Sequence, residues 1–197
     1  MNTIQMDRIK NTATQKRIHP HKFTMWVAMA SITMMFAGFT SAYIVKRNQG
    51  NWLEFELPVI FWYSTFVILL SSLTMHLSLK SFKAREMQRY RVLITITAFL
   101  GVLFTVLQWM GFQQLKAAGI DLLGIRSNTA ASFLFVITGM HILHVLGGVV
   151  ALLVIFLRAY RTTVKQYSPV GLEIAATYWH FVDILWIYLF IFYSWIG

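Results

Sequence analysis

The sequence predicts an all-α polytopic membrane protein: a five-transmembrane-helix bundle with a cytoplasmic N-terminus and its C-terminus outside. Three observations predict this fold. The 197 residues are 57% hydrophobic and only 12% charged, whereas about a quarter of the residues in a soluble domain are charged. Five apolar runs are each long enough to cross a bilayer as a helix, which takes about 20 residues. Lys and Arg residues gather in alternate connecting segments.

The five apolar runs predict the transmembrane helices in chain order. In lipid, every backbone N–H and C=O group must be hydrogen-bonded within the protein, so such runs are expected to be helical. The connecting segments are too short to hold a soluble domain. The predicted spans are approximately 24–45, 57–79, 92–115, 130–157 and 172–196.

Residues 1–22 are predicted to form a polar cytoplasmic tail, and residues 23–197 a five-helix transmembrane domain. The first apolar run is longer than the apolar region of a secretory signal peptide, and another span follows it rather than a mature domain. We therefore expect the first helix to be retained. The sequence contains no cysteine, which excludes disulfides and thiolate metal sites.

The basic residues predict the orientation of the chain in the membrane. The 17 Lys and Arg residues lie in the tail and in the second and fourth connecting segments, except for Lys46, Arg47, Lys116 and Arg126. By the positive-inside rule, this distribution places the N-terminus in the cytoplasm. It also explains the net charge of +10 by topology and by contact with anionic lipid headgroups. A nucleic-acid partner is therefore not expected.

Each predicted helix carries one stripe of small or polar side chains at helical spacing. Transmembrane helices pack through such stripes, because small residues let backbones approach and polar residues bond across the interface. We therefore expect the stripes to face the interior of the bundle. They comprise Ala30, Thr33, Ala37, Thr40 and Ser41, then Ser64, Ser71, Thr74 and Ser78, then Thr97, Gly101, Thr105 and Gln108, then His141, His144, Gly147, Gly148 and Ala151, then Glu173, Ala176, Thr177, His180, Asp183 and Ser194. The predicted helix-packing positions are Gly101, Gln108, Gly139, Gly147, Gly148 and Ala151.

Ionisable residues inside a span are candidates for function, because they are costly to place in hydrocarbon. Here they suggest a structural or proton-linked polar cluster of His141, His144, Glu173, His180 and Asp183. His144 and Asp183 fall at similar predicted depths, near the midplane. If the last two helices are neighbours, these two residues are expected to pair.

Three interpretations of this cluster are open: a polar clasp between helices, a metal or heme site, and a proton relay or transport site. His141 and His144 lie one turn apart on one helix, which does not supply axial ligands on opposite faces of a heme. A di-iron site needs more carboxylates than this interior offers. Inverted repeats and paired broken helices, which mark transporters, are not evident. We therefore expect no catalytic or metal-ligating residue in this chain.

Two motifs occupy the last two predicted spans. The segment TGMHILHVLGG, residues 138–148, is followed by LEIAATYWHFVDILWIYLF, residues 172–190. Their order and spacing resemble subunit III of the heme–copper oxidases, the cytochrome c oxidase subunit III family, in its five-helix form. The residues that match the family motifs are Thr138, Gly139, His141, His144, Val145, Gly148, Glu173, Tyr178, Trp179, His180, Phe181, Val182, Asp183 and Trp186.

The resemblance implies an accessory subunit without a redox centre. In that family, subunit III packs mainly on subunit I, which holds the hemes and copper, and on subunit II, and it binds phospholipid. The complex reduces dioxygen to water with electrons from cytochrome c and pumps protons, and subunit III supports assembly, stability and proton uptake. The implied location is the bacterial cytoplasmic (inner) membrane, with a larger respiratory supercomplex as a further partner.

Two alternatives stay open beside this interpretation. One is the equivalent subunit of a quinol oxidase or a nitric oxide reductase. The other, from a different class, is an independent heme- or metal-binding membrane protein.

The chain departs from the family pattern at two places. The first helix of the family in this frame usually reads A-S-E-V, whereas this sequence reads ASIT, so Ile32 replaces a buried glutamate. The family often has Glu-Tyr shortly after the glutamine of the third span, where this chain has Gly111 and Phe112. A role of the replaced acid in proton handling is therefore not expected here.

Overall fold

A computed structural model describes residues 20–48, 52, 57–122, 128–161 and 169–196, with the backbone alone over 158–161. In this part of the chain there are five helices and no strand. They are α2 (Pro20–Arg47), α3 (Ile60–Lys83), α4 (Met87–Ala117), α5 (Thr129–Arg161) and α6 (Val170–Ile196). Each is long and apolar enough to cross a membrane, which confirms the predicted five-helix membrane fold.

The helix ends differ from the predicted spans for local reasons. The helix α2 begins at Pro20, inside the predicted tail, because proline is tolerated in a first helical turn, where its missing N–H has no helical partner. Residues 1–19 of that tail lie outside the described residues. The helix α3 begins at Ile60, after Pro58, whose carbonyl accepts a hydrogen bond from Phe61 N at 3.0 Å.

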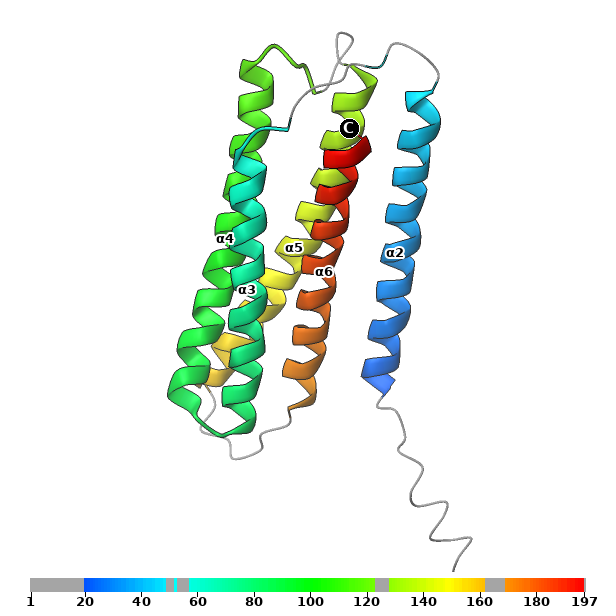
Figure 1. Cartoon of the computed structure of the whole chain (residues 1–197). Helices are drawn as coiled ribbons and strands as arrows, with labels where there is room; N and C mark the ends of the chain where they lie inside the picture. Colours follow the sequence, from blue (N-terminus) through cyan, green and yellow to red (C-terminus); the bar gives the residue numbers. More distant parts are fainter. Residues whose placement is uncertain (1–19, 49–51, 53–56, 123–127, 162–168, 197) are drawn as a thin grey trace, which may run out of the picture.

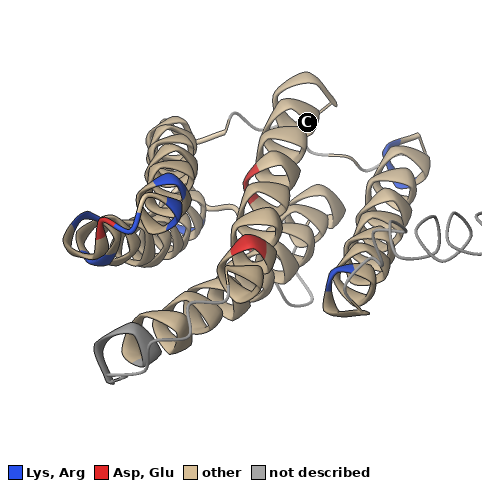
Figure 2. Cartoon of the chain, turned by 90° about the horizontal axis from the view of Figure 1, so that it is seen from below, with Lys and Arg blue, Asp and Glu red and all other residues tan. Residues whose placement is uncertain are grey.

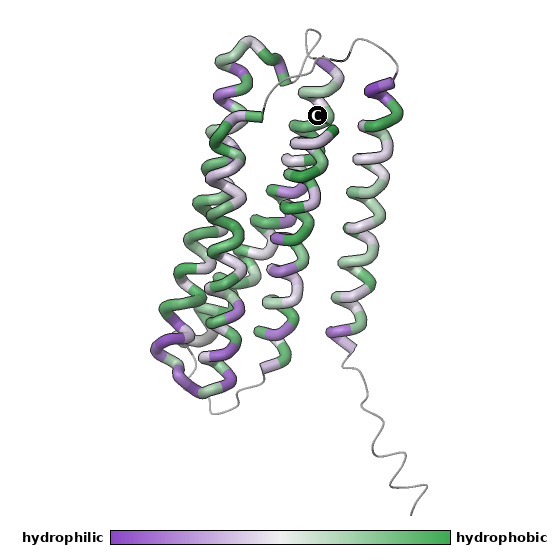
Figure 3. Tube along the Cα trace, in the orientation of Figure 1, coloured by the Kyte–Doolittle hydropathy of each residue, from purple (hydrophilic) through white to green (hydrophobic). Residues whose placement is uncertain are grey.

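The helices form one bundle in which α6 is central (Figure 1). It packs against α2, α3 and α5, while α3 and α4 form an antiparallel pair and α5 packs against α4. The helix α2 packs only on α5 and α6 within the described part of the bundle, so it is the least embedded helix. The tube coloured by hydropathy shows the apolar residues along the helices and more hydrophilic residues near the ends (Figure 3).

The polar stripes of α3 and α4 face each other, as expected. Gln108 Nε2 donates to Ser64 Oγ at 2.8 Å, and the Thr74 and Thr97 hydroxyls are 2.9 Å apart. Ser64, Thr97 and Gln108 are fully buried. The small Ser and Thr side chains of these stripes allow this close approach, and the polar groups bond across the interface.

The stripe predicted for α2 is wrong in its orientation. Ala30, Thr33, Ala37 and Ser41 are exposed, and of this stripe only Thr40 is buried. The buried face of α2 consists of Met29, Phe36, Thr40 and Tyr43. Because α2 touches only two neighbours, large side chains fill the space beneath it. The Tyr43 ring lies edge-on to Trp52 at 4.6 Å and to Phe192 at 5.2 Å.

Candidate functional site: a polar pocket leading to a buried carboxyl group

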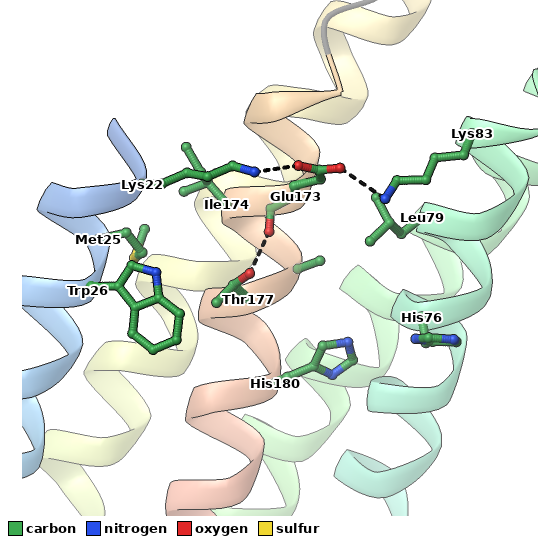
Figure 4. A pocket seen from close by; sticks show the side chains of 11 residues that line it. Lys22, Met25, Trp26, His76, Leu79, Lys83, Glu173, Ile174, Thr177 and His180 are labelled. Atoms are coloured by element: carbon green, nitrogen blue, oxygen red, sulfur yellow. Dashed lines mark hydrogen bonds and ion pairs between the residues drawn. The ribbon is translucent and has the colours of Figure 1, made fainter. Parts of the chain in front are cut away.

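Glu173 joins three helices at one end of the bundle (Figure 4). It lies in the first turn of α6, where the helix dipole favours a negative charge. Its carboxylate oxygens accept from Lys22 Nζ of α2 at 2.8 Å and from Lys83 Nζ of α3 at 2.9 Å. The Glu173 side chain is 24% exposed, so water screens these ion pairs only in part.

A pocket of about 440 Å³ opens beside this triad, between α2, α3 and α6. Its lining combines charged, imidazole and aromatic side chains, among them Lys22, Trp26, His76, Lys83, Glu173 and His180. The rings of His76 and His180 are 6.4 Å apart across the pocket. The two lysines are matched by one carboxylate, so the pocket keeps a basic character.

Asp183 lies about one turn deeper than His180 on the same helix. It is 2% exposed, and neither carboxylate oxygen has a hydrogen-bond partner in the described part of the chain. Ser72 Oγ of α3 is 2.7 Å from His180 Nδ1, and this hydroxyl also lies close enough to interact with the Asp183 carboxyl group. The hydrogen bond that the Ser72 hydroxyl forms is the one with His180.

The predicted pairing of His144 with Asp183 is not formed. His144 Nδ1 donates to the Met140 carbonyl at 2.7 Å, and the imidazole lies edge-on to Phe36 of α2 at 5.8 Å. Asp183 instead lies near Ser72 of α3. A helical wheel places both residues on interior faces, but it does not say which helix each one meets. The His144 side chain of α5 packs against α2, whereas the Asp183 side chain of α6 lies toward α3.

His141 is enclosed by aromatic rings and fully buried. Its imidazole stacks on Trp186 at 5.3 Å and lies edge-on to Phe104 at 5.9 Å. Neither ring nitrogen has a hydrogen-bond partner among the described residues. His141 therefore packs as an aromatic residue and does not join the pocket.

The helix-packing positions divide into two sets. Gly101 and Gly148 lie against the Trp179 indole, and Gln108 bonds Ser64. In contrast, a Cβ on Gly139 or Gly147 would meet no atom within 4 Å from another described helix, and Ala151 is exposed. The close packing expected at Gly139, Gly147 and Ala151 is not made among the described residues.

Three contributors to the site were missed at the sequence level: Lys22, Lys83 and Ser72. The two lysines were assigned to topology alone. Ser72 is adjacent to the predicted stripe residue Ser71. Its role follows from the packing of α3 against α6, which the spacing of residues in the sequence does not reveal. Ile32, which replaces the family glutamate, is partly buried and packs against the hydrophobic core.

In the part of the chain that the structure describes, His141 and His144 of α5 do not fit a bound metal or heme. No group of three His, Asp or Glu side chains within the described ranges is arranged to hold a metal ion. The His141 ring is covered by aromatic side chains, and His144 Nδ1 is engaged by a backbone carbonyl. Both histidines come from one helix, so they do not face each other across a heme.

Comparisons with known proteins agree with the motifs in α5 and α6. The family model described as "Cytochrome c oxidase subunit III" matches residues 51–197. The cytochrome c oxidase subunit 3 of Thermostichus vulcanus is 30% identical over 172 residues, covering 83% of this chain and 81% of its own length. The probable cytochrome c oxidase subunit 3 of Mycobacterium leprae is 32% identical over 197 residues, covering 91% of this chain and 92% of its own length. A protein of the same description from Nocardia farcinica is 32% identical over 175 residues, covering 82% of this chain and 81% of its own length.

Proposed function

The chain belongs to the cytochrome c oxidase subunit III family, and from this premise we propose the place that it takes in its oxidase. It is an accessory, non-catalytic subunit of a heme–copper oxidase complex and a multi-pass membrane protein. In our proposal it packs mainly on subunit I and also on subunit II, which carry the hemes and copper. The complex reduces dioxygen to water with electrons from cytochrome c and pumps protons, and this chain supports its assembly, stability and proton uptake.

One observation carries this assignment: the α6 motif builds the packing centre of the bundle. Trp179 and Trp186 are fully buried, and their indole N–H groups donate to Ser71 Oγ and Thr65 Oγ1 of α3, each at 3.0 Å. Two motif residues thus fix α6 onto α3. Such a centre suits a scaffold subunit that binds a neighbouring subunit through the apolar outer faces of its own helices.

The basic end of the bundle supports the proposed orientation in a bacterial cytoplasmic membrane. Lys22, Lys80, Lys83, Arg85 and Arg89 all lie where α2 and α4 begin and α3 ends. Figure 2 looks onto this end, with Lys and Arg in blue. By the positive-inside rule, this end would face the cytoplasm and the C-terminal end of α6 the outside.

The pocket at this end supports the proposed binding of phospholipid. Lys22, Lys83 and the Trp26 indole all line this pocket, and the adjoining helix faces are apolar. Basic and aromatic side chains together suit an anionic headgroup at the membrane surface. Lipid analysis of the purified complex tests this: Lys22→Ala with Lys83→Ala should lower the amount of anionic phospholipid retained, and Lys46→Ala should not.

The test of the assignment is to purify the chain through an affinity tag from its native membrane and to identify the chains that accompany it. We expect a heme–copper subunit I and a subunit II, with cytochrome c-dependent oxygen consumption. A chain that is purified without a heme–copper protein would contradict the proposal. The same preparation reveals whether a larger respiratory supercomplex contains the oxidase.

A further inference from the structure

Two rows of polar side chains lead from the pocket into the bundle. On α6 the row is Glu173, His180 and Asp183, and on α3 it is Lys83, His76 and Ser72. The rows come together at three levels: Lys83 pairs with Glu173, the ring centroids of His76 and His180 are 6.4 Å apart, and Ser72 bonds His180 at 2.7 Å. Polar groups therefore continue from the mouth of the pocket to Asp183.

The end of this path is a carboxyl group without a partner. Asp183 lies about 15 Å along α6 from Glu173, roughly half the thickness of the hydrocarbon core. An unpartnered carboxylate at such a depth is costly, so the group requires either a proton or a counter-charge. Around Asp183 the described residues supply no counter-charge, and the Ser72 hydroxyl is the polar group that lies near it.

His180 is placed to connect the two ends. Its side chain lines the pocket, and its Nδ1 contacts Ser72. The titratable and charged groups around it are Lys22 from α2, His76 and Lys83 from α3, and Glu173 and Asp183 from α6 itself. From α5, His141 and His144 turn elsewhere, toward Trp186 and Phe36.

We propose that Asp183 is a proton-binding site, reached from the pocket through His180 and Ser72. A proton from water in the pocket binds to His180 Nε2. His180 then gives its Nδ1 proton to Ser72 Oγ, and Ser72 passes its own hydroxyl proton to an Asp183 carboxylate oxygen. One proton has moved from the pocket to Asp183, Ser72 is unchanged, and His180 is left as the other neutral tautomer. The site stores a proton inside the bundle, which goes beyond the scaffold role and does not depend on it, since every group in the path belongs to this chain.

Hydrogen–deuterium exchange of the Asp183 carboxyl group, followed by infrared spectroscopy on the purified complex, tests the path. The carbonyl stretch of a protonated carboxyl group shifts when its proton is replaced by deuterium. Asp183→Asn identifies the band by removing it from the spectrum. We expect Ser72→Ala and His180→Phe each to slow the deuterium shift of this band by about tenfold or more.

The matched control is Thr177→Ala, which removes a hydroxyl from the lining of the same pocket but away from the path. It should leave the exchange rate unchanged, and Ser72→Thr, which keeps a hydroxyl, should retain fast exchange. Because Ser72→Ala and His180→Phe interrupt the path independently, a folding defect in one variant does not decide the test. The proposal is overturned if Asp183→Asn removes no protonated-carboxyl band, or if exchange is equally fast in Ser72→Ala and His180→Phe.

Discussion

The indole of Trp179 lies so close over Gly101 that a Cβ on this glycine would be 2.6 Å from Trp179 Cη2. The ring cannot easily move, because its N–H is bonded to Ser71 and Gly148 of α5 borders its other edge. A Cβ on Gly148 would lie 3.0 Å from two carbons of the ring. The two glycines thus form a slot between α4 and α5 that holds the Trp179 ring of α6.

Alanine at these glycines should destabilise the bundle in a graded way. Gly101→Ala should cost about 1–3 kcal/mol through overpacking, and Gly148→Ala less, because its contacts are longer. Gly147→Ala is the matched control, since its Cβ would contact no other described helix within 4 Å, and higher helix propensity should make it neutral or slightly stabilising. Thermal unfolding of the detergent-solubilised chain measures this order. Equal effects at Gly101 and Gly147 would be inconsistent with the slot.

Glu173→Gln should loosen α2 from the bundle, because it removes the acceptor of both ion pairs that join α2 and α3 through α6. Both lysines are partly exposed, so the loss in stability should be about 1 kcal/mol or less and should shrink at high salt. The chain contains no cysteine. Spin labels on cysteines introduced at Val27 and Leu77 can therefore report the distance between α2 and α3.

The expected result for Glu173→Gln is a broader distance distribution between these labels. Glu86→Gln is the control, because among the described residues the ion pair of Glu86 is the one with Arg89 in the first turn of α4, which does not involve α2. It should leave the distribution unchanged. An unchanged distribution in both variants would show that α2 is held without the triad.

Arg85→Gly should stabilise the chain by about 0.5–1 kcal/mol. Arg85 has a φ of 61° in the turn between α3 and α4, where Glu86 N bonds Ser81 O at 3.0 Å. This is the left-handed position that follows a helix and that glycine occupies without steric cost. Arg85→Ala removes the same charge but keeps the Cβ, so glycine should unfold at a higher temperature than alanine. The reverse order would refute this explanation.

Ser64→Ala should leave the buried Gln108 amide without its acceptor and cost about 1–3 kcal/mol. Adding Gln108→Leu should recover part of this loss, because no polar group then remains unpaired. A double-mutant cycle by thermal unfolding measures the coupling between the two positions. Strictly additive effects would mean that the 2.8 Å bond contributes nothing to stability.

The sequence allowed the helices and the polar α3–α4 interface to be predicted, because apolar length and the spacing of Ser64, Thr97 and Gln108 are periodic signals. It did not predict the face of α2 or the separation of Asp183 from His144. Both depend on which helices are neighbours and on how far apart they lie, and a helical wheel contains neither quantity. The pocket escaped prediction for the same reason, since its lining comes from three helices that are distant in the chain.

We propose that this chain holds an oxidase together and carries no redox centre. The most direct measurement is the visible spectrum of the purified complex before and after this subunit is selectively removed, together with the spectrum of the released chain. We predict heme bands of unchanged position in the depleted complex and no heme absorbance in the released chain. Heme that leaves with this chain would contradict the account.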